Sequence, residues 1–423
     1  MDNIKNIGFV STRIEGTDGV SLEIEKWAQV LERNNFNCFY FAGRCDREPD
    51  KSLVVPEAFF DHPEIKEIQN KCIGSTHRST ETSDKIHKIS DFLKSKLYKF
   101  IKKFDIHLLI VENALAIPMN IPLGLAITEF TVETCFPVIA HHHDFYWERD
   151  RFIINAAKDY LDSAFPPKLT SIKHVTINSL ASEQLSLRKG ISNIVIPNVY
   201  DFSKEPDKTS SKTCSEIRKV AGLEKDDIMV LQPTRVVPRK WIERAVETVY
   251  LMNLKEPKLF ISHAASDEGK NYFKRIKNYS NILGVEIVTL DKYVGSERNV
   301  KKNNNKKYTI GNMYDCADII TYPSGYEGFG NAFLETIYHK KPIIVNRYSI
   351  FIADIEPKDF DVITFDGFIT EETVQNALNL LKDKERLKHM VEKNYKLGMR
   401  FFSYEVLEFH LLGLIKSLSL RGC

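Results

Sequence analysis

Short apolar runs alternate with longer amphipathic stretches along the chain. The runs are rich in Val, Ile, Leu and Phe and contain few polar positions, which is typical of strands buried on both faces of a parallel sheet. The first set of predicted strands comprises residues 6–12, 38–43, 107–113, 137–143, 174–179 and 193–198. The second set comprises residues 228–234, 258–264, 285–290, 318–323 and 342–346.

The amphipathic stretches predict helices between these strands. Residues 18–34 follow the first strand directly, residues 371–402 form one or two helices, and residues 404–418 form a last amphipathic helix. The polar stretch 203–216 separates the two sets of strands. We therefore predict an α/β protein with two doubly wound, Rossmann-like domains, residues 1–200 and 201–402, that face a cleft.

Length and composition agree with this organisation. A chain of 423 residues exceeds one ordinary hydrophobic core. Hydrophobic residues make up 43% and charged residues 27%, as in soluble globular proteins. The net charge of only +2 argues against nucleic acid as a partner. The Lys- and Asn-rich stretch 296–309 predicts an exposed loop.

No targeting segment is expected. The first residues lack the apolar run of a signal peptide, and the longest apolar stretch, 117–127, is interrupted by Pro118, Asn120 and Pro122. The seven cysteines show no Cys-x-x-Cys spacing, so we expect reduced thiols and a cytoplasmic protein.

One helix has a basic, amphipathic pattern. Residues 84–104 place six apolar side chains at helical spacing with lysines between them: Ile86, Ile89, Leu93, Leu97, Phe100 and Ile101. Such a helix can lie on an anionic membrane surface. We favour a helix packed on the first sheet, because the alternation of strands and helices requires one before residues 107–113.

Four loops at strand ends carry candidate chemistry, because ligands of open α/β sheets bind beyond the carboxyl ends of the strands. They are "RIEGTDGVS" (13–21), "HHHDFYWERDR" (141–151), "PTRVVPRKW" (233–241) and "GYEGFGN" (325–331).

These loops suit a diphosphate ligand with hydroxyl groups. Backbone N–H groups at Gly16 and Gly19 can approach phosphate oxygens at a helix start, and Arg235 and Lys240 add full charges. Carboxylates such as Glu327 and Glu335 accept hydrogen bonds from sugar hydroxyls. The alternatives are a plain tight turn for the glycines and a solvated rim for the two cations.

The order of these features resembles family four of the retaining glycosyltransferases, which have the GT-B fold. The resemblance is carried by four segments: "VIPNVYDF" (195–202), "PTRVVPRK" (233–240), "NMYDCADIITYPSGYEGFGNAFLETI" (312–337) and "KKPIIVN" (340–346). Residues 402–415 are similar to the family's closing helix, which implies that residues 403–423 cross back to the first domain.

The resemblance implies roles for the glycine-rich segment and its neighbours. Glu335 binds the nucleotide ribose and Glu327 lies by the donor sugar. Arg235 and Lys240 hold the diphosphate. The residues that contribute backbone contacts are Phe329, Gly330 and Asn331.

The resemblance also implies an active-site histidine in the first domain. His143, followed by Asp144, matches that position, and Gly16 and Gly19 match the loop that faces the donor phosphates. The three consecutive histidines leave the choice between His143 and His141 open. The chain also has "PTR" where the family often has "GR".

The implied reaction moves a hexose from GDP-mannose or UDP-glucose to an acceptor hydroxyl with retention of configuration. No protein nucleophile is implied, and Arg235, Lys240 and backbone amides stabilise the departing diphosphate. No cofactor is required and no metal is expected. The Asp359-Phe360-Asp361 element is not expected to bind one.

Several alternatives stay open. They are a GT-B epimerase or phosphorylase, transfer to a lipid-linked or polysaccharide acceptor at the membrane surface, and a non-catalytic sugar-nucleotide-binding protein. The intact acidic and basic residues favour the transferase. The sequence does not specify the oligomeric state.

The acceptor is expected on the first domain. Tyr146 and Trp147 offer flat apolar faces to a sugar, and Arg149 and Arg151 can bind a carboxylate or phosphate. This combination favours a small soluble acceptor such as a sugar acid. The equal alternative is that Trp147 anchors the next helix while the arginines pair with Glu148 and Asp150.

Overall fold

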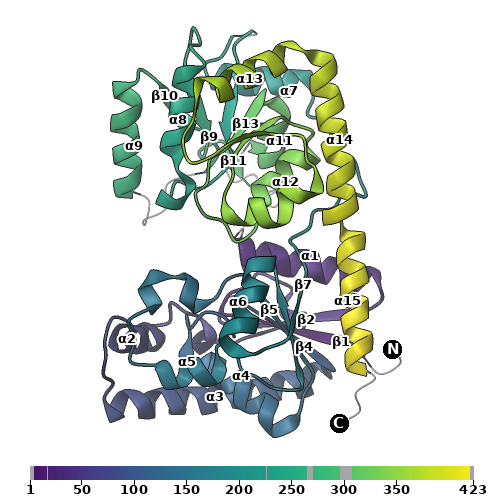
Figure 1. Ribbon diagram of the computed structural model, residues 1–423. Helices are drawn as coiled ribbons and strands as arrows, with labels where there is room; N and C mark the ends of the chain where they lie inside the picture. Colours follow the sequence, from purple (N-terminus) through teal and green to yellow (C-terminus); the bar gives the residue numbers. More distant parts are fainter. Residues whose placement is uncertain (1–3, 17, 225, 264–269, 296–306, 420–423) are drawn as a thin grey trace. The chain divides into compact units, whose positions relative to one another are not determined.

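The chain forms two compact units. The computed structural model describes residues 4–16, 18–224, 226–263, 270–295 and 307–419. One unit contains Met1–Asn198 and Tyr404–Cys423, and the other contains Val199–Ser403 (Figure 1). Below they are called unit 1 and unit 2. Most of the predicted loop at 296–309 lies outside the described residues.

Unit 1 contains a seven-stranded parallel sheet in the order β3-β2-β1-β4-β5-β6-β7. The strands are β1 Asn6–Val10, β2 Asn37–Ala42, β3 Ser52–Val54, β4 Leu108–Glu112, β5 Val138–His142, β6 Ile172–Thr176 and β7 Asn193–Val195. All six predicted strands of the first set are confirmed. The edge strand β3 was missed because three residues are too few for a periodic pattern.

Helices connect and cover this sheet. They are α1 Gly19–Arg33, α2 Pro63–Cys72, α3 Thr80–Phe104, α4 Ile121–Thr134, α5 Lys158–Ala164, α6 Ser179–Lys189 and α15 Tyr404–Ser419. Four 3-10 helices are η1 Pro49–Lys51, η2 Pro56–Ala58, η3 Tyr146–Glu148 and η4 Asp150–Phe152. The closing helix α15 packs on α1, and the Tyr404 hydroxyl donates to Gln29 at 3.1 Å. The predicted return of the chain to the first unit is confirmed.

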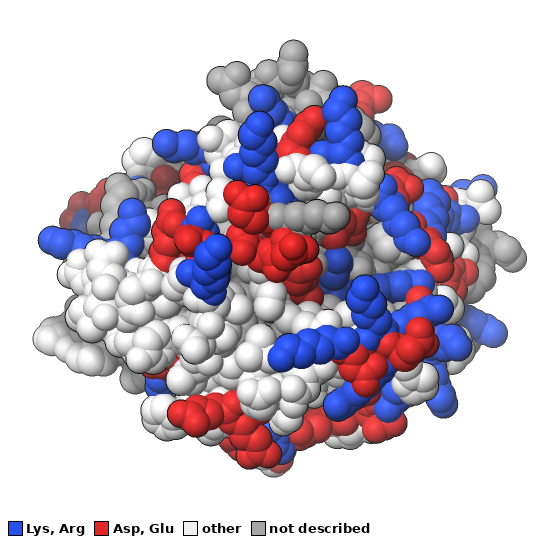
Figure 2. All heavy atoms as spheres, turned by 90° about the horizontal axis from the view of Figure 1, so that it is seen from above, with Lys and Arg blue, Asp and Glu red and all other residues white. Residues whose placement is uncertain are grey.

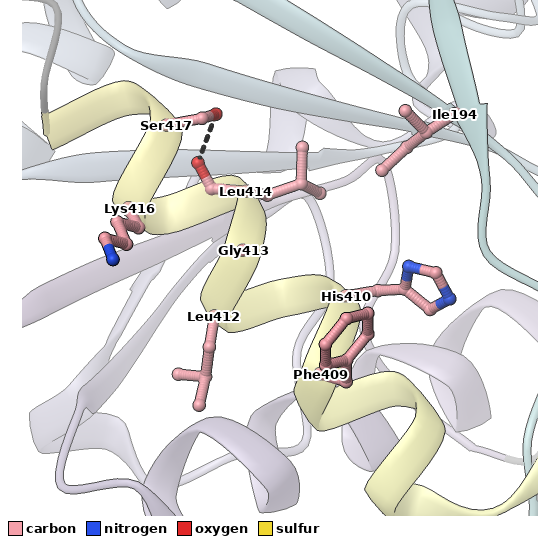
Figure 3. Close-up of a pocket in the computed structure, with 8 residues that line it drawn as sticks. All are labelled: Ile194, Phe409, His410, Leu412, Gly413, Leu414, Lys416 and Ser417. Carbon is pink, nitrogen blue, oxygen red and sulfur yellow. Dashed lines mark hydrogen bonds between the residues drawn. The ribbon is translucent and has the colours of Figure 1, made fainter.

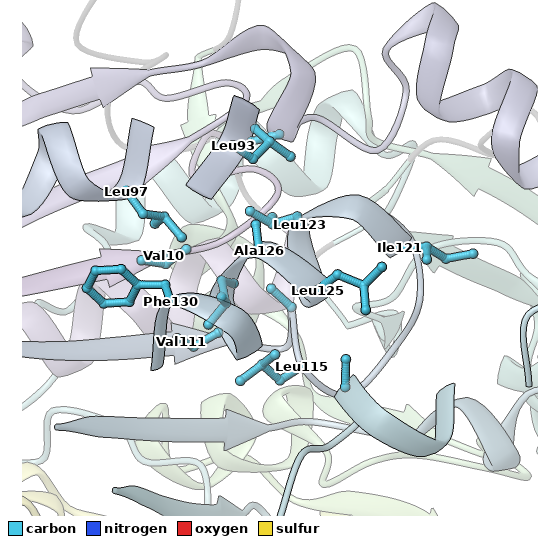
Figure 4. Packing of buried hydrophobic residues seen from close by; sticks show 14 of the residues in the cluster. Val10, Leu93, Leu97, Val111, Leu115, Ile121, Leu123, Leu125, Ala126 and Phe130 are labelled. Atoms are coloured by element: carbon cyan, nitrogen blue, oxygen red, sulfur yellow. The ribbon is translucent and has the colours of Figure 1, made fainter. Parts of the chain in front are cut away.

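The basic helix α3 is a core helix. Its apolar side chains Leu93 and Leu97 are fully buried and share a cluster with Ala126 and Phe130 of α4 (Figure 4). On the outside, Lys94 bridges Glu129 and Glu133 of α4 at 2.9 and 2.7 Å. The packed-helix interpretation is therefore confirmed, because the apolar face is already covered by protein.

Unit 2 contains a six-stranded parallel sheet in the order β10-β9-β8-β13-β14-β15. The strands are β8 Val230–Gln232, β9 Lys258–Ile261, β10 Glu286–Thr289, β13 Ile319–Tyr322, β14 Ile343–Asn346 and β15 Ile363–Phe365, with β11 Val294–Gly295 and β12 Tyr308–Thr309 pairing separately. The five predicted strands are confirmed, and the edge strand β15 was missed.

The helices of unit 2 alternate with its strands. They are α7 Ser211–Val220, α8 Ile242–Leu251, α9 Lys270–Ile282, α11 Ile310–Cys316, α12 Asn331–Tyr338, α13 Glu371–Lys382 and α14 Lys384–Phe402. Shorter turns are the 3-10 helices η5 Pro238–Lys240 and η8 Glu356–Lys358 and the π-helix η7 Phe351–Ile355.

Each sheet has one point where the strand order reverses. In unit 1 it lies between β1 and β4, and in unit 2 between β8 and β13. Ligands of such sheets bind beyond the strand ends at this switch point. The loops after β1, β8 and β13 were selected from the sequence, whereas the end of β4 was overlooked.

One expectation about the cysteines is wrong. Cys214 of α7 and Cys316 of α11 form a disulfide, with their Cα atoms 5.3 Å apart. The two helices pack together although the cysteines are 102 residues apart in sequence, so no local spacing could reveal the pair. Among the other described cysteines, Cys38, Cys45, Cys72 and Cys135 are free thiols.

The described helices include none that is long and apolar enough to span a membrane. On the face shown in Figure 2, Lys and Arg side chains are interspersed with Asp and Glu, in keeping with the small net charge. That face carries no broad basic surface of the kind that binds nucleic acid.

Candidate active site

A buried carboxylate joins the two loops at the switch point of unit 2. Glu327 is 6% exposed. Its Oε2 accepts a hydrogen bond from Arg239 Nη1 at 2.6 Å, and its Oε1 pairs with the ammonium group of the buried Lys240. Burial opposes ionisation, but the charges of Lys240 and Arg239 outweigh it and lower the pKa of Glu327 to about 2. Glu327 is therefore ionised and paired at neutral pH.

Lys240 does not lie in an open loop as its sequence context suggested. It ends the 3-10 helix η5 and is buried, whereas Arg235 near the end of β8 is exposed. Its pairing with Glu327 indicates that the Lys240 side chain contributes to the stability of the fold. A lysine removed from a buried pair leaves a charge without its partner.

Two glycines of the segment are required by its own packing. A Cβ on Gly325 would lie 2.3 Å from the Trp241 indole. Gly330 has φ +127°, and a Cβ there would lie 2.5 Å from the hydroxyl of Tyr348, which donates to the carbonyl of Phe329 at 2.7 Å. Because Gly325 N–H also donates to Arg239 O at 2.9 Å, the loop is fixed by protein contacts alone.

The second glutamate of the segment is held by a tyrosine. Glu335 lies on α12, which begins at Asn331 directly after Gly330. The buried Tyr314 hydroxyl of α11 donates to Glu335 Oε2 at 2.7 Å. Burial and the Glu335 charge raise the pKa of Tyr314 well above its ordinary value, so the phenol stays a donor.

The three histidines at the end of β5 have different surroundings. His141 is buried and stacks on Trp27 of α1, with ring centroids 4.2 Å apart. His142 points to the other face of the sheet and pairs with the buried His174 at 2.9 Å. The side chain of His143 is 12% exposed, so it is the one of the three that solvent reaches.

Two residues at the end of β4 organise this region. Glu112 Oε2 lies 2.9 Å from His141 Nδ1 and 3.2 Å from His143 Nε2. Asn113 accepts the His143 backbone N–H at 3.1 Å and donates to Asp144 at 3.2 Å. Burial opposes ionisation of Glu112, but the two imidazoles outweigh it and lower its pKa to about 2.

This cluster also brings together possible metal ligands. Atoms of Glu112, His141 and His143 lie within 4.8 Å of one another. The sequence did not reveal this grouping, and the expectation that no metal is required stays a prediction. No such spacing is visible in sequence, because Glu112 comes from a neighbouring strand.

The glycine loop after β1 makes carboxylate contacts. Gly16 has φ +75°, and its N–H donates to Asp46 at 3.0 Å. Gly19 is the first residue of α1, where Asp18 accepts hydrogen bonds from the N–H groups of Val20 and Ser21. Of the two amides proposed for phosphate, that of Gly16 is thus engaged by a side chain of this same unit, and Asp18 engages the two N–H groups that follow Gly19.

The predicted acceptor loop is anchored in unit 1. The ring of Trp147 stacks on the buried Phe145 at 4.5 Å, and Tyr146 packs on the same cluster. Arg149 Nε donates to Asp144 at 2.5 Å, and the Arg151 guanidinium lies 4.4 Å from the Phe152 ring. Arg149 thus pairs with Asp144, and not with Glu148 or Asp150.

A separate hollow lies along α15. Its volume is about 520 Å³, and its lining is mostly apolar, with Ile194, Phe409 and Leu414 among the residues shown in Figure 3. None of the candidate site residues lines it. The strand-end sites therefore stay the better candidates.

The sequence is similar over nearly its full length to two mannosylglucosylglycerate synthases. The Thermotoga maritima enzyme is 31% identical, covering 92% of this chain and 95% of the relative. The Petrotoga mobilis enzyme is also 31% identical, covering 90% of this chain and 92% of the relative. The family described as "Glycosyl transferases group 1" matches residues 214–397. The chain belongs to the group 1 glycosyltransferases.

Solved glycosyltransferase structures share its fold. A glycosyltransferase from Rickettsia africae superposes with a TM-score of 0.71 at 15% identity, covering 99% of this chain and all of that one. Sucrose-phosphate synthase from Thermosynechococcus elongatus superposes with a TM-score of 0.66 at 14% identity, covering 98% of this chain and 99% of that one. Anabaena HepE in complex with UDP superposes with a TM-score of 0.63 at 13% identity, covering 98% of this chain and 100% of that one. The predicted GT-B fold is confirmed.

Sequence reasoning missed four residues of the candidate site. They are Glu112, Asn113, Arg239 and Tyr314. Arg239 stands beside Lys240, and Glu112 and Asn113 end a predicted strand, so the strand-end rule could have found these three. No pattern in the sequence points to Tyr314, because its partner Glu335 lies on a different helix.

We expect Lys240→Met to lower the free energy of unfolding by about 3 kcal/mol, because Glu327 then stays buried with Arg239 alone. Urea denaturation measures this value. Adding Glu327→Gln to Lys240→Met should recover part of the loss. Arg235→Met, an exposed cation of the same loop, should change stability by less than about 0.5 kcal/mol. Equal losses for Lys240→Met and Arg235→Met would contradict the buried pair.

Proposed function

We propose that this glycosyltransferase transfers mannose from a nucleotide-diphosphate sugar, with retention, to a small soluble sugar acid of the glucosylglycerate type. The observation that carries the proposal is the near full-length similarity to two mannosylglucosylglycerate synthases. Their name describes a product with a mannosyl group, a glucosyl group and a glycerate. Of the two donors expected from sequence, GDP-mannose matches this product.

The donor is assigned to the loops at the switch point of unit 2. Arg235, Lys240 and the newly found Arg239 supply positive charge for the diphosphate. Glu335, oriented by Tyr314, is assigned to the ribose hydroxyls. The backbone of Phe329, Gly330 and Asn331 enters α12, where helix N–H groups suit a phosphate.

The chemistry follows from this distribution of charge. The acceptor oxygen bonds to the anomeric carbon, the bond from that carbon to the phosphate oxygen breaks, and the acceptor proton passes to the departing phosphate. Lys240 and Arg239 are already ordered by Glu327, so they stabilise the leaving charge with little reorganisation. Glu327 lies by the donor sugar in this assignment.

The acceptor is assigned to the loop after β5 in unit 1. Asp144 accepts a hydrogen bond from Arg149 Nε, and the guanidinium of Arg149 has further N–H groups that can bind a carboxylate. Trp147 and Tyr146 supply apolar surface for a sugar ring. His143 is the substrate-facing histidine, since His141 and His142 are buried.

Purified protein should transfer mannose from GDP-mannose to glucosylglycerate. We expect weaker transfer to glucosylglycerol, which has the same sugar without the carboxylate, and weaker use of UDP-glucose. Product formation is followed by chromatography, and the anomeric configuration by NMR. Equal rates with the charged and neutral acceptors would reject the acidic acceptor, and inversion of configuration would reject retention.

Arg149→Ala should lower kcat/KM for glucosylglycerate by about ten- to a hundredfold, because a hydrogen bond to a charged group is lost. The KM for GDP-mannose and the rate with glucosylglycerol should change little. Lys158→Ala removes an exposed cation of the same unit and serves as the control. An equal loss with both acceptors would assign Arg149 a purely structural role.

We expect EDTA to leave the transfer rate unchanged. Three cationic side chains, Arg235, Arg239 and Lys240, provide the charge that a metal ion supplies in other transferases. The rate is measured after extensive dialysis against the chelator. Activity lost to EDTA and restored by magnesium or manganese would contradict metal-independent transfer.

A further inference from the structure

Glu112 is a fully buried carboxylate without an assigned role. It is the last residue of β4, beside the switch point of the unit 1 sheet, and is 1% exposed. Both imidazole contacts go to the same oxygen: His141 Nδ1 lies 2.9 Å and His143 Nε2 3.2 Å from Oε2. Its other oxygen, Oε1, has no hydrogen-bond partner among the described residues.

Strand register explains why two of the three histidines meet Glu112. Glu112 pairs with His141 across β4 and β5. Side chains alternate between the faces of a strand, so His141 and His143 lie on one face and His142 on the other. His142 accordingly meets His174 of β6. The three histidines therefore belong to two groups. His141 and His143 contact Glu112 on one face, and His142 pairs with His174 on the other.

The two contacts define where the imidazole protons are. An ionised carboxylate only accepts hydrogen bonds, so the nitrogens that face Glu112 carry the hydrogens. His141 is then protonated at Nδ1 and His143 at Nε2. For His143 this leaves Nδ1 as the ring nitrogen that can meet a substrate. A nitrogen that donates to Glu112 has no lone pair for a metal ion.

The surroundings keep Glu112 in this position. His141 stacks on Trp27 with ring planes 25° apart, and both are buried. On the other side, Asn113 binds the backbone of His143 and the side chain of Asp144. His143 is therefore held by two consecutive residues. Asn113 binds its backbone N–H, and Glu112, the last residue of β4, contacts its ring at Nε2.

We propose that Glu112 is a positioning residue for His143, which it holds with Nε2 turned inward and Nδ1 directed to the substrate. His141 acts as a buttress that keeps the carboxylate in place. The inference rests on the proposed function, in which His143 is the substrate-facing histidine. It extends the site by a residue that touches no substrate itself.

The test combines imidazole NMR with steady-state kinetics on the full chain. Protein with 15N-labelled histidine reports the tautomer of each neutral ring, and a His143→Gln sample assigns the His143 signals. Glu112→Gln keeps the side-chain shape but removes the charge that requires two N–H donors. His174→Gln disturbs the other buried imidazole pair and is the matched control.

In the wild type, neutral His143 should be the Nε2–H tautomer. In Glu112→Gln this tautomer should lose its dominance, and kcat should fall by about tenfold or more while the KM for GDP-mannose stays unchanged. His174→Gln should leave the His143 tautomer as in the wild type. The NMR result needs no turnover, so it tests the geometry even if the proposed reaction proves wrong.

Three results would overturn the proposal. The first is a dominant Nδ1–H tautomer of His143 in the wild type, which decides the matter even if Glu112→Gln fails to fold. The second is an unchanged tautomer and kcat in folded Glu112→Gln. The third is stoichiometric binding of zinc or manganese that Glu112→Gln abolishes, because the cluster would then be a metal site.

Discussion

A carboxylate removed from water has to be paired with donors, and each unit of this glycosyltransferase places such a group at the end of a central strand. Glu112 ends β4 and Glu327 follows β13, so each lies next to the switch point of its sheet. Burial alone would favour their neutral forms, yet both have a pKa of about 2. The neighbouring loops must therefore supply cations or N–H groups at fixed positions.

These pairings order the side chains to which we assign a function before any substrate binds. Glu327 fixes Lys240 and Arg239, and the backbone bond from Gly325 to Arg239 ties the same two loops together. In unit 1, Glu112 and Asn113 hold His143 in the same way. Catalysis by electrostatic stabilisation requires this kind of order, because a charge that must move first contributes less to the transition state.

The sequence predicts what is local and misses what depends on strand order. Runs of apolar residues located eleven strands, and only short strands such as β3 and β15 were missed. By contrast, Glu112 lies 29 residues from His141, and Arg239 lies 88 residues from Glu327. Such partners become neighbours only through the order of the sheet, which periodicity does not encode. The glycine-rich segment was found because its backbone demands are local.

The balance of charge near the strand ends differs between the two units. In unit 1, two carboxylates near the strand ends each meet one arginine, Asp18 with Arg13 and Asp144 with Arg149. In unit 2 the single charge of Glu327 meets two cations, Lys240 and Arg239, and Arg235 lies in the same loop. In the proposed assignment, this surplus of positive charge suits the diphosphate. The Gly16 amide of unit 1, in contrast, donates to Asp46 and must leave it before it can contact a phosphate.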